Sequence, residues 1–141
     1  MIFYLGINKR IKLLHHHTLF FDEDLFQHSK EIYKNPQWPT NPLFYACCTS
    51  KSDDGVAPEG HENLFLLMPI AAGLNDSEEL REKYFQRMLK RLHKCTNENI
   101  LPNIDFKKSY CIKDFVADYN SYKGNAYGLA NTIIQTAILK P

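Results

Sequence analysis

The sequence predicts an α+β domain, in which helices cover mainly one face of a mixed or antiparallel sheet of about five strands. Three observations support this fold class. The chain opens with a dense apolar run at residues 2–7, which is typical of a buried strand. Four further short apolar segments follow, separated by polar stretches that contain glycine or proline. One longer segment, residues 78–94, carries apolar side chains at helical spacing.

The four further strands are expected where short apolar segments lie between predicted loops. Their ranges are residues 17–21, 43–49, 63–70 and 106–112. Segment 63–70 is apolar enough for a strand that is covered on both faces. Residues 35–42 contain three prolines and Trp38, and residues 51–61 are polar with glycine and proline, so both segments are predicted loops.

The strongest helix is predicted to begin after Asp76 or Ser77, because either side chain can accept hydrogen bonds from the first free backbone N–H groups. Acidic residues fill its first turn and basic residues its last turn, as the helix dipole favours. Its predicted core-facing stripe consists of Leu80, Tyr84, Met88 and Leu92, widened by Phe85 and Leu89.

Two shorter helices are predicted from the same kind of capping residue. Asp22 can cap a helix that runs to about Tyr33. Asp114 can cap a short helix that runs to about Tyr119. The sequence shows no internal repeat and no low-complexity segment, so its 141 residues are expected to form a single domain.

Composition excludes some classes of partner and favours one compartment. A net charge of +1 gives no electrostatic basis for binding nucleic acid. No apolar segment reaches the roughly 20 residues that a transmembrane helix needs, and no signal peptide is expected. The cysteines lack C-x-x-C spacing, so we expect four reduced thiols in a cytoplasmic protein. They are Cys47, Cys48, Cys95 and Cys111.

Three consecutive histidines, His15, His16 and His17, raise the question of a metal site. In a strand, His15 and His17 would share a face. No Asp, Glu or Cys stands at an obvious partner spacing, however, and a polar junction between loop and strand explains the run. We therefore predict no metal ligand in this chain.

Four motifs in the same order give the chain a resemblance to the phytoene desaturase family. They are YLG at residues 4–6, HHT at residues 16–18, VAPEG followed by ENLFLLMP within residues 56–69, and DFVADYNSYKGNAYGLANTIIQTAILKP at residues 114–141. The bacterial-type members of this family are FAD-dependent carotenoid desaturases. The resemblance covers nearly the whole chain and implies that it corresponds to their substrate domain.

The glycines argue against a flavin site within these residues. A dinucleotide site needs a strand, a glycine-rich turn and a helix, and no three of the six glycines have G-x-G-x-x-G spacing. We therefore expect residues 1–141 to be a fragment that lacks its dinucleotide-binding domain. The resemblance implies FAD in the full-length oxidoreductase, which acts on CH–CH bonds, and an isolated chain that is inactive.

The resemblance also implies a substrate and partners. The substrate would be a hydrophobic polyene such as phytoene, and the missing FAD-binding domain would be a partner. Peripheral membrane contact and a homo-oligomer are compatible with the sequence. A related flavoenzyme (carotenoid isomerase, carotenoid oxygenase or retinol saturase) is one alternative, and a non-enzymatic lipid-binding or partner-binding α+β domain is another.

The resemblance provides candidate substrate-binding residues, although no catalytic residue is identified. The candidates are His16, His17, Thr18, Glu59, Tyr119, Tyr122, Tyr127 and Gln135. The histidine motif either places an imidazole near the substrate or fixes a turn. The carboxylate either belongs to a solvated acidic turn, or bonds backbone donors within a structural motif, or stabilises a cationic polyene or takes up a proton. The tyrosines either pack around glycine turns or line the substrate channel, and the glutamine is either a capped or partly exposed helix position or part of that channel.

Overall fold

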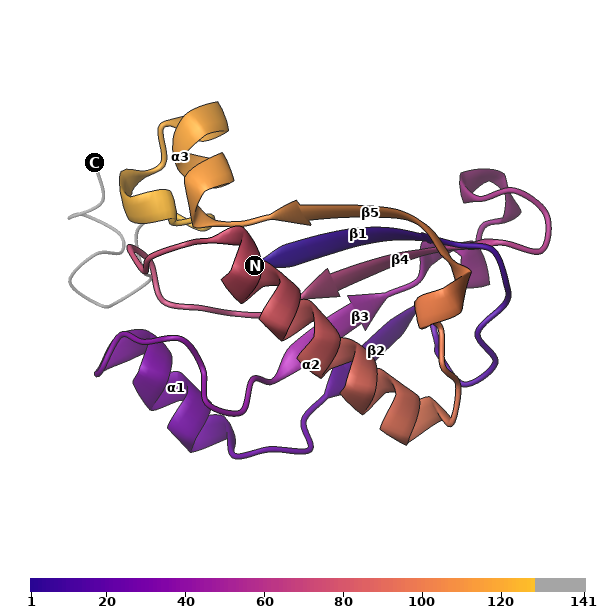
Figure 1. Ribbon diagram of the computed structural model, residues 1–141, viewed down its shortest axis with the longest axis horizontal. Coiled ribbons are helices and arrows are strands. Elements are labelled where there is room, and N and C mark those ends of the chain that lie inside the picture. The colour runs from indigo at the N-terminus through magenta and orange to yellow at the C-terminus, as the bar shows by residue number, and fades with distance from the viewer. Residues whose placement is uncertain (129–141) are drawn as a thin grey trace, which may run out of the picture.

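A computed structural model describes residues 1–128 of the chain. Its strands are β1 (Ile2–Ile7), β2 (His17–Phe20), β3 (Phe44–Cys47), β4 (Glu62–Leu67) and β5 (Ile104–Tyr110). They form one sheet in the order β2-β3-β4-β1-β5, and every neighbouring pair is antiparallel (Figure 1). The predicted α+β class is confirmed, and the sheet is antiparallel throughout.

Three α-helices accompany the sheet. They are α1 (Leu25–Tyr33), α2 (Glu78–Thr96) and α3 (Ile112–Tyr119). Helix α2 runs diagonally across one face of the sheet, whereas α1 and α3 lie at the end where β1 starts (Figure 1). Within residues 1–128, no helix is both long enough and apolar enough to cross a membrane.

The strands lie where the sequence places them, with shifts at their ends. Strand β3 stops at Cys47 because residues Thr49–Lys51 turn into a short 3₁₀-helix. Strand β5 begins at Ile104 and ends at Tyr110, two residues earlier at both ends than predicted. Its early end has a local cause, since Cys111 is already the N-cap of α3.

Two of the predicted helix caps are wrong by a few residues. Asp24, not Asp22, caps α1 by accepting hydrogen bonds from the N–H groups of Phe26 and Gln27, at 2.8 and 3.0 Å. Asp22 instead forms an ion pair with Arg91 of α2. For α2, Ser77 is the cap, as one of the two alternatives predicted.

The cap of α3 also differs from the prediction. Asp114 lies inside the first turn of α3, and Cys111 occupies the cap position. The Asp114 carboxylate accepts a hydrogen bond from the Cys111 N–H at 2.8 Å, which is half of a capping box. A carboxylate can therefore stabilise this helix start from within the helix as well as from the preceding residue.

The core lies between α2 and one face of the sheet. The Phe85 ring of α2 contacts the Phe3 ring of β1, with ring centroids 5.0 Å apart. Leu80 is partly buried, and the other predicted stripe residues are buried: Tyr84, Phe85, Met88, Leu89 and Leu92. The predicted core stripe is therefore confirmed.

A buried ion cluster joins the start of α2 to α3. Arg81 donates two hydrogen bonds to Asp76, at 2.8 and 2.5 Å, and lies 2.8 Å from an Asp114 carboxylate oxygen. Asp76 also accepts from the backbone N–H of Lys113 at 3.1 Å. Arg81 is 6% and Asp76 2% exposed, so each would be a strongly destabilising charge without the other.

The predicted loop at residues 35–42 is held by a second buried carboxylate. Glu31 of α1 accepts hydrogen bonds from Gln37 at 3.0 Å and from the Thr40 hydroxyl at 2.7 Å. Trp38 stacks on Tyr84 with centroids 5.1 Å apart and donates to the Asn75 carbonyl at 2.9 Å. These contacts attach the loop to both α1 and α2.

Leu92→Ala should lower the free energy of unfolding by about 2–5 kcal/mol, because Leu92 is fully buried and its removal leaves a cavity. Urea denaturation followed by far-UV circular dichroism measures this change. Leu25→Ala is the matched control, since Leu25 is a helical leucine that is 54% exposed. Equal effects of the two substitutions would contradict the assigned core.

Asp76→Asn should destabilise the fold at neutral pH and weaken its acid dependence. Burial raises the pKa of Asp76, but hydrogen bonds from Arg81 and Lys113 outweigh burial and hold the pKa below its usual value. Such a carboxylate stabilises the fold above its unfolded pKa, and this contribution is lost as the pH falls through the folded pKa.

We therefore expect the substitution to cost about 3–5 kcal/mol at pH 7 and less as the pH falls below about 4. Urea denaturation at a series of pH values measures both effects. Glu23→Gln is the control, because Glu23 is exposed. A loss of stability that does not depend on pH would contradict the assigned ion pair.

Candidate functional site

Within the described residues, one face of the sheet carries no helix. Side chains alternate between the two faces of a strand, so residues directly opposite each other on neighbouring strands share a face. Tyr4 lies opposite Phe65, which in turn lies opposite Cys47. We call this surface the open face and define it by Ile2, Tyr4, His17, Leu19, Tyr45, Cys47, Phe65 and Leu67.

A row of aromatic rings crosses the open face. The Tyr4 and Phe65 rings meet edge to face, with centroids 5.5 Å apart, and the Phe65 and Tyr45 centroids are 6.3 Å apart. The Tyr45 ring then stacks on His17 at 5.9 Å. The row therefore runs across β1, β4, β3 and β2 and presents a broad π surface to any ligand on this face.

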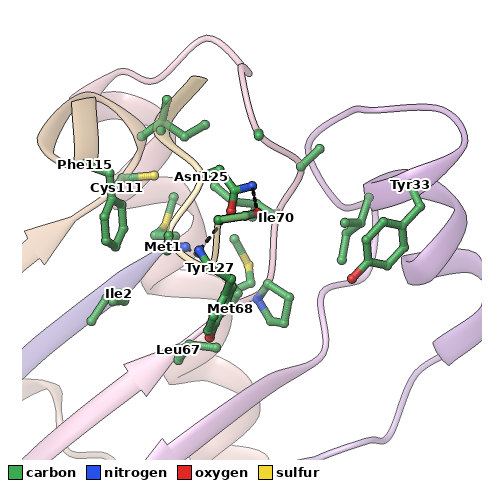
Figure 2. A pocket seen from close by; sticks show the side chains of 18 residues that line it. Met1, Ile2, Tyr33, Leu67, Met68, Ile70, Cys111, Phe115, Asn125 and Tyr127 are labelled. Carbon is green, nitrogen blue, oxygen red and sulfur yellow. Dashed lines mark hydrogen bonds between the residues drawn. The ribbon is translucent and has the colours of Figure 1, made fainter. Parts of the chain in front are cut away.

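A pocket of about 540 Å³ adjoins the open face at the end of the sheet where β1 starts. Its wall is mainly apolar, as the side chains of Ile2, Leu67, Met68, Ile70 and Phe115 show in Figure 2. Ile2 and Leu67 belong to both the pocket and the open face. The volume falls within the range of about 300–1,000 Å³ that is typical of small-molecule sites.

The pocket offers a bound ligand few polar groups. The Asn125 side chain donates to the Gly128 carbonyl at 2.6 Å and accepts from the Tyr127 N–H at 2.9 Å (Figure 2). Its amide is thus already bonded within its own turn. Together, the pocket and the open face suit a long ligand that is recognised by shape and apolar contact.

Gly124 positions the turn that closes one side of the pocket. Its φ is +68°, and a Cβ at this residue would lie 2.6 Å from the Ile112 carbonyl oxygen. The turn is tied back by a hydrogen bond from the Gly73 N–H to the Lys123 carbonyl at 2.8 Å. The YKGNAYG motif therefore needs a glycine here for two reasons, its backbone angle and its close approach to α3.

Polar side chains gather at the β2 end of the open face. The His17 Nδ1 and the Tyr45 hydroxyl are hydrogen-bonded at 2.6 Å, and the His16 Nδ1 is hydrogen-bonded to the Ser52 hydroxyl. A hydrogen bond with Cys47 and, to a smaller extent, burial raise the pKa of Tyr45 to about 12. The Tyr45 hydroxyl therefore stays protonated at neutral pH.

No cysteine stands at a metal-ligand spacing from the histidines in the sequence, but the folded chain brings Cys47 next to them. Strands β2 and β3 pair so that Cys47 lies directly opposite His17. Cys48 points to the other face, where it is fully buried and donates to Glu62 at 3.0 Å. Burial, followed by this contact, raises the pKa of Cys48 to about 12. Of the two adjacent thiols, Cys47 is the one on the open face.

The other predicted site residues are dispersed. Thr18 is half-buried, and its hydroxyl accepts from the His15 N–H at 3.2 Å. The Glu59 side chain is exposed, and the backbone carbonyl of Glu59 is hydrogen-bonded to the His61 Nδ1 at 2.9 Å. The exposed tyrosine Tyr127 lines the pocket, whereas Gln135 lies outside the described residues.

The remaining two tyrosines lie near the pocket without forming its wall. Tyr119 is 71% and Tyr122 79% exposed. The Tyr119 ring lies 6.2 Å from the ring of Phe115, which does line the pocket. Tyr122 lies under the Lys123 ammonium group at 5.3 Å. The structure thus places one of the three predicted tyrosines, Tyr127, at the pocket.

Sequence reasoning missed the aromatic residues of the open face. Segment 63–70 was expected to be covered on both faces, and this is wrong, since Phe65 and Leu67 are only half-buried. Their alternation with the buried Leu64 and Leu66 could have indicated a one-sided strand. The polar Asn63, which lies on the same face as Phe65, also indicates that this face of the strand is not covered.

Comparison with known proteins gives relatives along almost the whole chain. A carotenoid 3,4-desaturase from Haloarcula japonica is 41% identical over 140 residues, which are 99% of this chain and 28% of the relative. A 4,4'-diaponeurosporene oxygenase from Staphylococcus haemolyticus is 30% identical over 130 residues, which are 91% of this chain and 26% of the relative. No protein-family model matches the chain.

A third relative has another reaction in its name. A 4,4'-diapolycopen-4-al dehydrogenase from Metabacillus indicus is 26% identical over 141 residues, which are 100% of this chain and 28% of the relative. The chain spans between 26% and 28% of the length of these three proteins. The chain is therefore a homologue, over this part of their length, of the carotenoid desaturase family that its four motifs resemble.

Proposed function

We propose that the chain forms the substrate-binding part of an FAD-dependent oxidoreductase that acts on a carotenoid-like polyene. The observation that carries the proposal is the aromatic open face, which is continuous with an apolar pocket of about 540 Å³. The relatives named as a carotenoid desaturase and a diaponeurosporene oxygenase support this substrate class.

The proposed task of these residues is to hold and orient the polyene. A hydrocarbon chain has no hydrogen-bonding groups, so dispersion contacts and removal of apolar surface from water must provide its affinity. Tyr4, Tyr45 and Phe65 offer ring faces along which an extended polyene can lie. The pocket would receive one end of the substrate, next to Tyr127.

The flavin, when bound, would accept the two hydrogens that leave the polyene. The described helix starts do not suit its pyrophosphate. Carboxylates already occupy them, with Asp24 at α1, Glu78 and Glu79 at α2, and Asp114 at α3. A pyrophosphate needs free N–H groups and a positive helix end, and these carboxylates would repel it. We therefore assign flavin binding to a further domain of a longer protein.

We assign the reaction type within this class from the relatives. Desaturation is our first assignment, because the relative with the highest of the three identities is a carotenoid 3,4-desaturase. The cytoplasm, with peripheral contact to the membrane that stores such apolar substrates, is the proposed location. A related flavoenzyme is the alternative to a desaturase. The proposal includes assembly into a homo-oligomer.

A non-enzymatic lipid-binding domain is the second candidate, and the same open face favours it. The reading frame on both sides of the coding sequence separates the two candidates. The enzyme requires a strand–GxGxxG–helix segment on one side and a second glycine-rich flavin segment on the other. A frame that lacks both segments would favour the lipid-binding domain.

Phe65→Ser should weaken polyene binding by about tenfold or more, since it removes a ring from the centre of the aromatic row. Lycopene delivered from a cyclodextrin complex is a suitable probe, and circular dichroism induced in its visible band reports binding to the chain. Phe26→Ser is the matched control, because Phe26 is 79% exposed on α1 and away from the open face. Equal affinities of the two variants would refute the assigned surface.

The chain alone should not retain FAD, because its described helix starts carry carboxylates rather than a glycine-rich turn. Purified protein incubated with FAD and then dialysed should show no flavin absorbance. Urea denaturation of the same sample confirms that the chain was folded. A stoichiometric yellow complex would place the flavin site within this chain and overturn the assignment to another domain.

A further inference from the structure

We propose that His16, His17 and Cys47 form a binding site for a borderline-soft divalent metal ion of the Zn²⁺ type. We call these three residues the His–Cys cluster. Each residue offers one ligand atom, and the three atoms lie within 4.8 Å of one another. The site does not rest on the proposed function, because it depends only on these side chains and their neighbours.

The strand register brings the ligands together. His17 and Cys47 lie directly opposite each other on β2 and β3, so their side chains share the open face. His16 precedes β2 but stays beside β3, because its carbonyl accepts from the Cys48 N–H at 2.8 Å. The centroids of the two imidazole rings lie 4.2 Å apart, and the ring planes are tilted by 40°.

Neighbouring hydroxyl groups orient both imidazoles. The Nδ1 of His16 is hydrogen-bonded to the Ser52 hydroxyl, and the Nδ1 of His17 is hydrogen-bonded to the Tyr45 hydroxyl at 2.6 Å. Metal-binding histidines generally use their second ring nitrogen in this way, which fixes the tautomer and the ring orientation. Coordination through the Nε2 atoms would keep both of these hydrogen bonds.

The required adjustment is small. Zinc binds nitrogen at about 2.0–2.1 Å and sulfur at about 2.3 Å, so tetrahedral ligand atoms lie roughly 3.3–3.7 Å apart. One ring nitrogen of each histidine and the Cys47 sulfur lie within 4.8 Å of one another, so this cluster must contract by roughly 1 Å. Rotation of the side chains also determines which ring nitrogen binds the ion. His17 is exposed, and His16 and Cys47 are half-buried, so all three have room to move.

The ligand types select the class of metal. Two imidazoles and a thiolate suit Zn²⁺, Co²⁺ and copper, whereas Mg²⁺ and Ca²⁺ prefer oxygen ligands. Binding breaks the S–H bond of Cys47, forms a metal–thiolate bond and releases the proton to solvent, without any change of oxidation state. Three protein ligands leave a fourth position for water.

A bound ion would also stabilise the edge of the sheet. Among the strands of residues 1–128, β2 lies at the edge of the sheet and pairs with β3. The ion would join the start of β2 to the end of β3 through side chains, in addition to the ladder between them. Because the unfolded chain does not preform this site, metal binding should raise the melting temperature.

Co²⁺ titration of the untagged, reduced and metal-free chain tests the proposal. A thiolate ligand gives a charge-transfer band in the near ultraviolet, and tetrahedral coordination gives strong visible bands. We expect both to appear at one equivalent of Co²⁺ and to disappear when Zn²⁺ is added. The melting temperature should rise with each metal.

Matched variants test the ligands individually. Cys47→Ser should abolish the charge-transfer band, whereas Cys95→Ser should keep it, since Cys95 is exposed and outside the cluster. His17→Gln should weaken Co²⁺ binding by about tenfold or more, and His15→Gln should leave it unchanged. Far-UV circular dichroism verifies that each variant is folded.

Several results would overturn the proposal. These are the absence of a charge-transfer band in the folded wild-type chain, a band that survives Cys47→Ser, and equal affinities of the His15 and His17 variants. Each outcome is independent of lycopene binding, so the metal site and the proposed function can fail separately.

Discussion

The packing of α2 against one face of the sheet is the constraint on which the rest of the structure depends. Phe85, Met88 and Leu92 fill the space above β1, β3 and β4, and their burial provides the main hydrophobic stabilisation. A strand can turn only every second side chain toward this helix. The intervening residues, among them Tyr4 and Phe65, must therefore lie on the opposite face, where no described helix covers them.

Buried carboxylates connect this core to the segments that form the pocket. Arg81 and Asp76 tie the start of α2 to α3, and Phe115 of α3 contributes to the pocket wall. Glu31 binds the loop that follows α1, and the last turns of α1 form the other side of the pocket. Arg81 and Asp76 are buried as an ion pair, and the buried Glu31 is hydrogen-bonded to neutral donors, so a polar framework supports the walls of this apolar site.

The open face has two chemically different parts. Its centre, from Tyr4 to Tyr45, is aromatic and suits an apolar polyene, which is consistent with the carotenoid enzymes among the relatives. Its β2 end carries imidazoles, a hydroxyl and a thiol, and the Tyr45 hydroxyl is hydrogen-bonded to His17. These polar groups could contact an oxygen atom of a ligand, or they could bind a metal ion.

The sequence by itself determined the α+β class, the five strands, the α2 core stripe and the family resemblance, because these depend on periodicity, composition and local motifs. It did not determine the strand register, which places Cys47 beside His17, or the uncovered face of β4, which displays Phe65. Both depend on which strands become neighbours and where helices pack, and these are long-range choices. The ion pair of Asp22 with the distant Arg91 is of the same long-range kind. The cap of α3 is different, because the local turn at Cys111 places Asp114 inside the helix.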